Sequence, residues 1–397
     1  MRICLVYDCL YPWTVGGAER WYRNLAERLA ADGHEVTYLT RRQWTDGDEP
    51  SVPGVRVVAV SPPMELYARG RRRVLPPLAF GLGVFWHLLR FGRRCDVVHT
   101  ASFPYFSLLA AGLVRPLAGF RLVVDWHEVW TRDYWHEYLG PVGGAVGWLV
   151  QRLCLRLPQR AFCFSRLHEQ RLRELRVNGG VTRLEGEYAG PLTAAAPVPA
   201  EPVVVFAGRH IPEKRVLALV PAIARAAEEI PELRCEIYGD GPEREQLLNA
   251  IEAAGLGGRI SAPGFVEPER VEAALRRALC LVLPSRREGY GVVIVEAAAL
   301  GTPSVVVAGP DNAAAELVEE GVNGFVAPSA SAEDLGAAIV RVYRSGNPLR
   351  ESTAAWFAAN AERLSIERSL DAMLVAYAPD TVTSHRPDAA GAGSPRT

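Results

Sequence analysis

The sequence predicts an α/β protein made of two doubly wound, Rossmann-like domains that face a cleft. The chain has 397 residues, which is too long for one compact hydrophobic core. Short apolar runs alternate with segments of helical periodicity along most of its length, a pattern typical of parallel sheets covered by helices. A stretch rich in proline and alanine, 189–202, lacks periodicity and divides this alternation into two series.

The first series predicts an N-terminal domain over 1–196. Strands are expected at the short apolar runs 3–7, 36–39, 55–60, 97–99 and 122–124. In the first predicted helix, Trp21, Leu25 and Leu29 share one face at four-residue spacing. Gly33 follows them and suits a left-handed helix end.

The second series predicts a C-terminal domain over 200–358. Buried strands are expected at 203–207, 235–238, 279–283 and 304–307, and helices at 216–229, 243–253, 269–277, 292–300 and 332–343. A last helical pattern, within 360–378, is expected to complete the N-terminal domain. Residues 379–397 are polar, aperiodic and rich in Pro, Gly and Ala, so a disordered tail is expected there.

The composition is that of a globular protein and limits the partners. Apolar residues make up 49% and charged residues 22%, and a formal net charge of -1 gives no field that would gather nucleic acid. The 7 cysteines are scattered and lie mostly in apolar runs, which indicates reduced core residues. The chain begins with a strand pattern and not with a secretion signal. A cytoplasmic protein without a nucleic-acid partner is expected.

The stretch 284–303 carries the most informative functional pattern. A strand ends, a glycine-containing loop follows and a helix opens, so backbone N–H groups and the positive helix end would face an anion above the sheet. Glu288 and Glu296 lie eight positions apart, and carboxylates accept hydrogen bonds from pairs of hydroxyls. On this pattern alone, an exposed Glu288 and a Glu296 paired structurally inside its own domain remain an open alternative.

A second pattern places two cations, Arg209 and Lys214, after the apolar run 203–207. At the edge of a strand they suit a diphosphate. Fixed cations in a water-poor cleft would stabilise the charge that builds on a departing nucleoside diphosphate, so no metal ion is expected. The alternative is a solvated Arg/Lys pair, since such side chains lie mostly at surfaces.

Two features of the N-terminal half point to the same cleft. Gly16 and Gly17 lie between the first strand and the first helix, where paired glycines let a ligand approach the backbone closely. His127 follows another apolar run and lies at the end of a predicted strand. A plain tight turn and a buried core histidine are the respective alternatives.

The segment 69–94 has basic ends around an aromatic and apolar centre. This composition suggests an interfacial segment that would contact a membrane surface peripherally, at its inner face, although a packed helix is the preferred interpretation. A spanning helix needs about 20 apolar residues, and Pro76, Pro77 and Arg90 interrupt this one. The alternative is a helix of the N-terminal domain that packs on its sheet. The interfacial interpretation would suit a lipid-linked acceptor.

Several other reactions find no support in the sequence. Asp46-Gly47-Asp48 has the spacing of a metal-dependent site, but it lies in a loop of turn formers with no strand leading directly into it. No Gly-x-Gly-x-x-Gly follows the first strand, and the chain contains no Walker-type lysine loop and no His-Glu-x-x-His. These absences argue against an oxidoreductase, an NTPase and a zinc hydrolase.

The whole string 284–303 resembles the donor-site signature of glycosyltransferase family 4, in which two glutamates separated by seven residues precede a small-residue helix that ends in Gly-Thr-Pro. The resemblance covers nearly all of the chain to Tyr377 and is strongest at 203–328. It implies the GT-B fold and a retaining enzyme that moves a sugar from a nucleotide-diphosphate donor, its co-substrate, without a metal or other cofactor. The implied acceptor is a glycan, a lipid-linked or a small molecule, as in cell-envelope polysaccharide or glycolipid synthesis.

By this resemblance, Glu288 contacts donor-sugar hydroxyls, Glu296 holds the nucleotide ribose and His127 faces the transferred sugar. Arg209 and Lys214 form a phosphate clamp. Further donor contacts, largely through the backbone, are implied for Gly16, Gly17, Gly208, Gly264, Phe265, Gly289, Tyr290, Gly291 and Val292.

The chain departs from the family pattern at three places. Tyr290 stands where phenylalanine is usual, Arg215 stands where glycine is common, and 185–188 reads Glu-Gly-Glu-Tyr where a Pro-Asn-Gly turn is more frequent. A phosphorylase, a nucleotide-sugar epimerase of related shape and a non-catalytic sugar-nucleotide binding protein remain alternatives.

Overall fold

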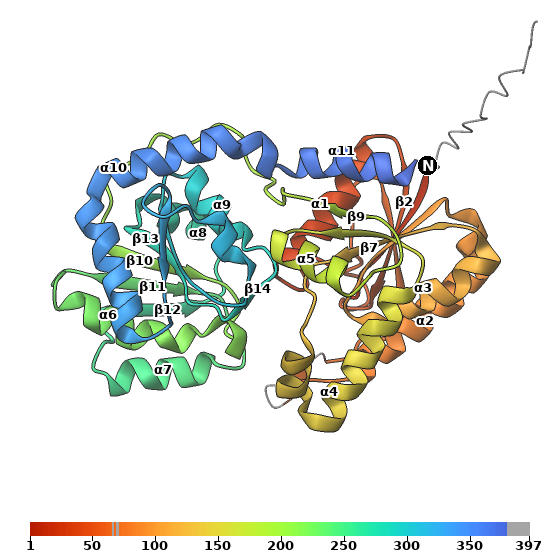
Figure 1. Cartoon of the computed structure of the whole chain (residues 1–397), viewed down its shortest axis with the longest axis horizontal. Coiled ribbons are helices and arrows are strands. Elements are labelled where there is room, and N and C mark those ends of the chain that lie inside the picture. Colours follow the sequence, from red (N-terminus) through yellow and green to blue (C-terminus); the bar gives the residue numbers. More distant parts are fainter. Residues whose placement is uncertain (66, 69–70, 379–397) are drawn as a thin grey trace, which may run out of the picture.

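Two parallel sheets form the body of the protein in the computed structural model, which describes residues 1–65, 67–68 and 71–378 (Figure 1). The N-terminal sheet has the strand order β3-β2-β1-β6-β7-β8-β9. Its strands are β1 (Arg2–Val6), β2 (Glu35–Arg41), β3 (Val55–Ser61), β6 (Val97–Ala101), β7 (Arg121–Trp126), β8 (Arg160–Cys163) and β9 (Val181–Arg183). The predicted α/β class with two doubly wound domains is therefore confirmed.

Helices cover both faces of the N-terminal sheet. Along β1, Ile3 and Leu5 belong to the core that includes α1, whereas Cys4 and Val6 belong to the core that includes α2, α3 and α4, because successive strand residues point to opposite faces. The helices are α1 (Gly17–Ala31), α2 (Leu75–Phe91), α3 (Tyr105–Ala118), α4 (Arg132–Arg156) and α5 (Arg166–Glu174). The smaller elements are β4 (Tyr67–Ala68), β5 (Arg71–Arg72) and η1 (Gly92–Arg94).

The C-terminal sheet has the order β12-β11-β10-β13-β15-β17. Its strands are β10 (Val203–Ala207), β11 (Arg234–Tyr238), β12 (Ile260–Gly264), β13 (Cys280–Leu283), β15 (Ser304–Val307) and β17 (Gly324–Ala327), and a short ladder joins β14 (Arg287–Glu288) to β16 (Asp311–Asn312). The helices are η2 (Pro212–Lys214), η3 (Val216–Ala218), α6 (Leu219–Ala227), α7 (Arg244–Ala253), α8 (Pro268–Arg277), α9 (Val292–Ala299) and η4 (Ala313–Leu317).

The last two helices carry the chain back to the N-terminal domain. α10 (Ala332–Leu364) kinks at Gly346, and α11 (Ile366–Tyr377) lies beside α1 (Figure 1). The helix expected within 360–378 is divided at Ser365, whose extended backbone ends α10 and whose hydroxyl accepts from the Arg368 N–H to begin α11. At the other end of α11, the Tyr377 hydroxyl lies 2.5 Å from His99 Nδ1.

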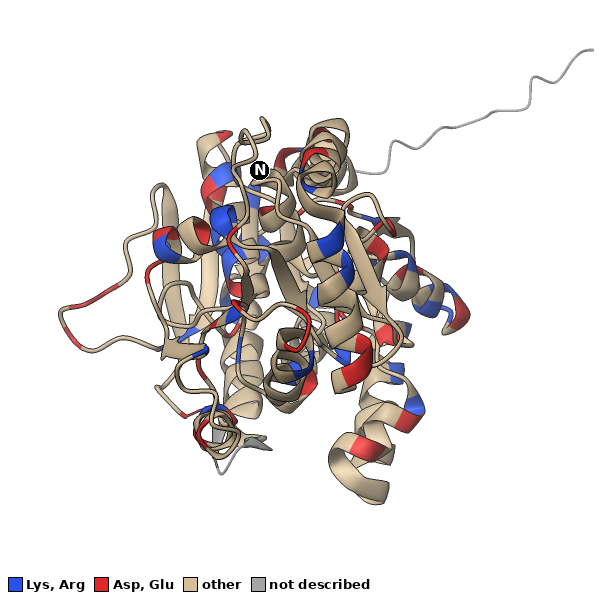
Figure 2. Ribbon diagram, turned by 90° about the vertical axis from the view of Figure 1, so that its left-hand side faces the viewer, with Lys and Arg blue, Asp and Glu red and all other residues tan. Residues whose placement is uncertain are grey.

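The segment 69–94 contains α2, which packs on the sheet through Phe80, Val84 and Leu88, as its structural alternative predicted. Residues 69–70 of that segment and the expected tail 379–397 lie outside the described residues. Basic and acidic residues intermingle over the ribbon in Figure 2, as expected for a chain with a net charge of -1.

Candidate functional site

Glu288 lies at the carboxyl end of the C-terminal sheet and is held by two donors. The buried strand β13 leads through Ser285 into β14, where Glu288 is 7% exposed. Its Oε1 accepts hydrogen bonds from Lys214 Nζ at 2.5 Å and from Ser285 Oγ at 2.8 Å. A buried carboxylate is unfavourable unless it is paired, so Lys214 fixes both the charge and the position of Glu288. The exposed alternative for Glu288 is wrong.

Lys214 is the only lysine of the chain, although lysine and arginine together number 44. It ends the turn η2, in the loop after β10 that also carries Arg209. A lysine ammonium is a compact charge with rotating donors, whereas a guanidinium is a planar fork. All the remaining Lys or Arg positions of the chain hold arginine, and only this position has a compact ammonium. That imbalance is a sequence signal that the motif comparison overlooked.

The loop after Glu288 closes tightly against the N-terminal domain. A Cβ atom on Gly289 would lie 2.5 Å from the carbonyl oxygen of His127, so only glycine fits there without a shift of the backbone. Gly291 adopts a left-handed conformation, with φ 99°, and α9 begins at Val292. The loop therefore brings the positive end of α9 and the end of β7 together.

Glu296, on α9, is paired with Arg20 of the N-terminal helix α1. Arg20 Nη1 lies 2.7 Å from Glu296 Oε1, and Glu296 raises the pKa of Arg20. The two side chains are 40% and 29% exposed, so the pair remains partly accessible to solvent. The alternative of a Glu296 paired inside its own domain is therefore wrong, because its partner Arg20 belongs to the other domain.

His127 lies at the end of β7 with one ring face against Phe164. The two ring centroids are 4.7 Å apart and nearly parallel, and burial lowers the pKa of His127, which keeps the imidazole neutral near pH 7. Its Nε2 has no hydrogen-bond partner among the described residues. The ring therefore has a polar edge that is not used by the surrounding protein.

A buried network supports the strand that carries His127. Asp125 Oδ1 lies 2.7 Å from His99 Nε2, and Asp125 Oδ2 accepts from Trp21 Nε1 at 2.9 Å. Burial raises the pKa of Asp125, but His99, His127 and the Trp21 N–H together more than offset it, so the pKa is lowered. Because Tyr377 contacts the same histidine, the last helix holds β7 in place.

Glu187 is a residue that the motif analysis did not assign to the site. Its carboxylate lies 3.8 Å from His127 Nδ1, and its side chain is 7% exposed. Burial and the charge of Asp125 raise the pKa of Glu187 to about 8, even though Arg20 opposes the shift. It belongs to 185–188, where the chain departs from the family's usual turn. That departure was the signal that could have identified it.

Arg287 fastens the two domains beside the site. Its guanidinium lies 4.3 Å from the Trp130 ring centroid and 4.4 Å from that of Tyr134, and its Nε lies 3.1 Å from Glu128. The planar cation thus sits against two aromatic rings of the N-terminal domain, a favourable arrangement when water is excluded. The contact defines the mutual position of the domains next to Lys214.

The remaining predicted residues lie around the same edge of the C-terminal sheet or across from it. Gly16 is extended and caps α1, while a Cβ on Gly17 would meet open space. Gly208 follows β10 and precedes the exposed Arg209. Gly264 ends β12 in a left-handed conformation, and Phe265 beside it is 58% exposed. Because β12 is an edge strand, these two residues lie farther from β13 than Lys214 does.

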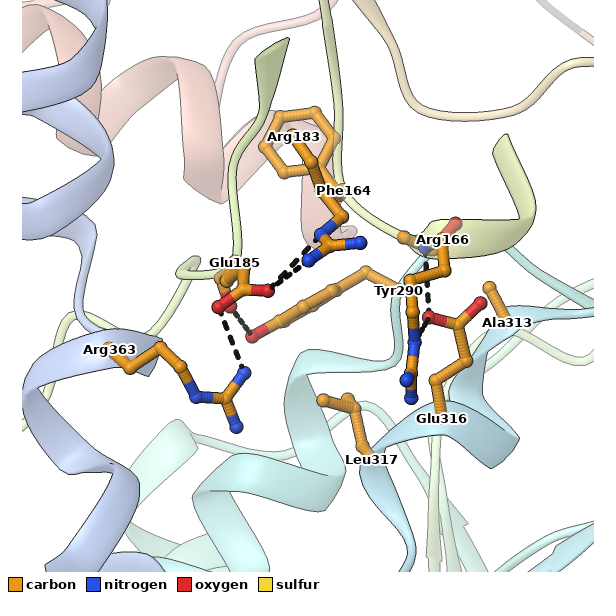
Figure 3. A pocket seen from close by; sticks show the side chains of 10 residues that line it. Phe164, Arg166, Arg183, Glu185, Tyr290, Ala313, Glu316, Leu317 and Arg363 are labelled. Carbon is orange, nitrogen blue, oxygen red and sulfur yellow. Dashed lines mark hydrogen bonds and ion pairs between the residues drawn. The ribbon is translucent and has the colours of Figure 1, made fainter. Parts of the chain in front are cut away.

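A polar cavity of about 340 Å³ lies between the domains beside the candidate site (Figure 3). Of the predicted site residues, all of them described, only Tyr290 lines it, and its hydroxyl donates to the Glu185 carbonyl oxygen at 2.7 Å. Glu316 accepts from the backbone N–H groups of Arg166 and Leu167. The walls of the cavity are thus formed by contacts between the two domains. Glu316 makes one of these contacts.

The structure also describes the Asp46 turn, and it bears on metal binding and on membrane-spanning helices. Asp46 is 94% exposed and paired with Arg42 in a surface turn. Over residues 1–65, 67–68 and 71–378, no cluster of three or more His, Cys, Asp and Glu side chains is arranged to hold a metal ion. Within the same residues, no helix is both long and apolar enough to cross a membrane.

Two family models match the chain, one in each half. The model for glycosyl transferases group 1 matches residues 195–361, and that for the glycosyl transferase 4-like domain matches residues 16–184. The first match contains Lys214, Glu288 and Glu296, and the second contains His127.

Three individual proteins resemble the chain at low sequence identity. The chain is 33% identical to the alpha-D-kanosaminyltransferase of Streptomyces kanamyceticus, over 36% of this chain and only 36% of that protein. It is 28% identical to the glycogen synthase of Mycobacterium tuberculosis, over 95% of this chain and 93% of that protein. The structure of Anabaena HepE in complex with UDP-glucose superposes with a TM-score of 0.71 at 19% identity, covering 95% of this chain and all of that one.

The order of the motifs, their placement at the facing edges of two doubly wound sheets and the family matches in both halves agree with one another. The chain belongs to the glycosyltransferases of the family 4 type, with the GT-B fold.

Proposed function

We propose that the protein transfers a sugar from a nucleotide-diphosphate donor to an acceptor hydroxyl, with retention of anomeric configuration and without a metal ion. The observation that carries this proposal is the pairing of Lys214, the only lysine, with Glu288 at the mouth of α9 and opposite His127. HepE, whose complex contains UDP-glucose, supports the donor class.

The C-terminal side of the site is suited to a departing diphosphate. Negative charge builds on the phosphate as the glycosidic bond breaks, and Lys214 with the amides at the start of α9 would stabilise it. Glu288 would exchange its contact with Lys214 for donor-sugar hydroxyls. Glu296 would likewise exchange Arg20 for the ribose, because carboxylates bind paired hydroxyls well.

The N-terminal side supplies neutral polar groups to the sugar. His127 Nε2 is buried and has no hydrogen-bond partner among the described residues, so a sugar hydroxyl that reached it on donor binding would satisfy it. Glu187, with a pKa of about 8, is mostly protonated at neutral pH and is therefore a poor nucleophile. We therefore favour front-side attack by the acceptor hydroxyl, with its proton passing to the departing phosphate oxygen.

The acceptor is proposed to be a glycan, a lipid-linked sugar or a small molecule, in cell-envelope polysaccharide or glycolipid synthesis. The glycogen synthase relative, whose name gives a glycan as its product, supports a glycan as acceptor. A cytoplasmic protein with a peripheral contact at the inner face of the membrane through 69–94 would suit a lipid-linked one.

The proposal is tested first by donor binding. UDP, GDP, ADP and CDP sugars are screened for an increase in melting temperature, since a ligand of the folded state alone stabilises it. The best donor is then offered to an acceptor panel with and without a chelator, and the product anomer is assigned by NMR. Sugar phosphate formed from inorganic phosphate would indicate a phosphorylase, donor conversion without acceptor an epimerase, and binding without turnover a binding protein.

The site is tested by a substitution with a matched control. Glu296→Ala should weaken nucleotide binding about tenfold, because a carboxylate that binds two hydroxyls is lost. Glu252→Ala, on the exposed surface of α7, should leave it unchanged. Equal affinities for both variants would place the nucleotide elsewhere.

A further inference from the structure

The outward surface of α2 is apolar. Its exposed residues recur at helical spacing along one stripe, and the Trp86 side chain in it is 60% exposed. The stripe consists of Leu75, Leu78, Leu82, Trp86 and Leu89. The helix already buries Phe80, Val84 and Leu88 against the sheet, so this second stripe is not needed for the domain core.

The second half of α4 repeats this arrangement. An exposed stripe again follows steps of three and four residues, and Val142 in it is 79% exposed. The stripe consists of Leu139, Val142, Val146, Leu149 and Leu153. On α3, between these helices, Leu113 and Leu117 are also exposed.

The three helices form one layer. α2 packs on α3 so closely that a Cβ on Gly81 would lie 2.5 Å from Phe106, and α3 meets the end of α4 where Gly112 faces Leu157. All three bury residues in the same core on one face of the sheet, and they lie along one flank of the N-terminal domain in Figure 1. Their outward stripes, with Leu113 and Leu117, are called the apolar face below.

Within α2, η1, α3 and the part of α4 after Gly140, the only charged residues are arginines. The sequence contains no Asp or Glu over 75–95, 97–124 or 138–168. Exposed arginines flank the stripes, namely Arg90, Arg93 and Arg94 at the end of α2 and Arg156 at the end of α4. Arg93 also donates to the Leu117 carbonyl oxygen at 3.2 Å, which joins the cationic end of α2 to α3.

We propose that the apolar face docks on the headgroup region of a bilayer containing anionic lipid. Leucine, valine and tryptophan side chains would enter the acyl boundary, and the flanking arginines would meet anionic headgroups. A solvent-exposed apolar surface of this continuity is unusual for a monomer in water. A face with only positive flanking charges fits an anionic surface better than it fits a second identical, equally positive face.

The proposal extends the membrane contact suggested for 69–94 to α3 and α4. Only the role of this contact, bringing the cleft to a lipid-linked acceptor, rests on the proposed function. In α4 the non-helical Gly140, with φ 75°, separates two parts. The first part reaches the cleft, where the Tyr134 hydroxyl donates to Glu213 at 3.2 Å. The second part carries the apolar stripe apart from Leu139, which ends the first part. Docking would therefore hold the cleft close to the bilayer surface, within reach of an acceptor anchored in lipid.

Sedimentation of the full chain with vesicles tests the proposal. Vesicles of phosphatidylcholine with 30% phosphatidylglycerol are compared with pure phosphatidylcholine, at low and at high salt. Binding to the anionic vesicles at least tenfold tighter than to the neutral ones, and weaker at high salt, is expected. The double variant Val142→Asp with Val146→Asp should lose at least tenfold in binding, because it removes apolar contact and adds repelling charge.

Two variants complete the test. Trp86→Ser provides a second probe, on α2, and Val375→Asp is the matched control, since Val375 is 77% exposed on α11, which packs in the core of the opposite sheet face. The control should bind like the native chain. Equal loss in all variants, no vesicle binding, or a dimer by analytical ultracentrifugation that the α4 variant dissociates would overturn the proposal. Glycosyl transfer to a soluble acceptor would survive each of these results.

Discussion

The two walls of the interdomain cleft neutralise their charges in different ways. On the C-terminal wall, Glu288 Oε1 lies 2.5 Å from Lys214 Nζ, so a carboxylate is paired with an ammonium. On the N-terminal wall, the nearest basic group to Glu187 is His127, 3.8 Å away, whose own pKa is lowered by burial. The C-terminal wall therefore offers an ion pair at Glu288, whereas the N-terminal wall offers neutral polar groups at His127 and Glu187 and a charged Arg20 that pairs with Glu296.

This difference indicates a division of roles. Paired ions can exchange partners, so the C-terminal wall can accept a phosphate at Lys214 and hydroxyls at Glu288 without leaving a charge buried and alone. Neutral groups on the N-terminal wall keep the local dielectric low, which strengthens the interactions of Lys214 with a charged leaving group. Changes on the C-terminal wall should therefore have the largest effects on activity.

The largest effect is expected from Lys214→Arg. The positive charge is kept, but the planar guanidinium cannot occupy the space of the ammonium between Glu288 and a phosphate, so kcat/KM for transfer should fall about 100-fold. Steady-state kinetics with the best donor measure this. Arg215→Lys, the reverse exchange at the adjacent residue, should stay within about threefold of the native rate. Native activity in Lys214→Arg would show that any cation suffices.

The next effect is expected from Gly289→Ala, which acts on the contact between the walls. The added methyl group would lie 2.5 Å from the His127 carbonyl oxygen, so the walls must separate, and kcat should fall about tenfold or more. Small-angle scattering should report a more open molecule. Gly257→Ala, where a Cβ meets open space, is the control. Native kcat and native scattering together would mean that the loop can move without affecting the site.

The two walls were also unequally predictable from the sequence. The C-terminal wall is built from one continuous strand, loop and helix, so the spacing of Glu288 and Glu296 within 284–303 located it. The domain class followed from the same kind of local pattern, because each strand and helix has its own periodicity. Lys214 lies only a short loop away from its own strand, and its motif was also recognisable.

The N-terminal wall depends on contacts between distant parts of the chain, which local patterns do not contain. Glu187 acquires its raised pKa only when folding places it against Asp125 and His127. Arg20 meets Glu296 across 276 positions of sequence. The aromatic contact of Arg287 likewise joins two domains, and the stripe on α4 has the periodicity of a buried helix face although it lies outward. Periodicity identifies an apolar face but not what covers it.

A smaller effect, on stability, is expected from Glu187→Gln. With a pKa of about 8 in the folded chain and an ordinary value of 4.5 when unfolded, Glu187 destabilises the fold once the unfolded chain ionises. No penalty exists below about pH 4.5, the penalty grows from there to about pH 8, and it is constant above. The variant should therefore gain stability over the native chain across this window, by about 2 kcal/mol at pH 8.

Denaturant unfolding at a series of pH values measures this difference. Glu252→Gln, an exposed glutamate on α7, should follow the native chain at every pH. A gain for Glu187→Gln that is the same at pH 5 and pH 8 would mean that Glu187 does not titrate in this window, and the two walls would then differ less than their geometry indicates.

The smallest effect is expected from Tyr290→Phe, which restores the residue usual in the family. The Tyr290 hydroxyl donates to the Glu185 carbonyl oxygen across the domain boundary, so its loss removes one cross-link between the walls and leaves the ring in place. The free energy of unfolding should fall by about 1 kcal/mol, while kcat should stay within about twofold. Thermal unfolding and transfer kinetics measure the two quantities separately. A tenfold loss of kcat at unchanged stability would instead assign the hydroxyl to the reaction, and the C-terminal wall would then contribute a neutral donor as well as paired ions.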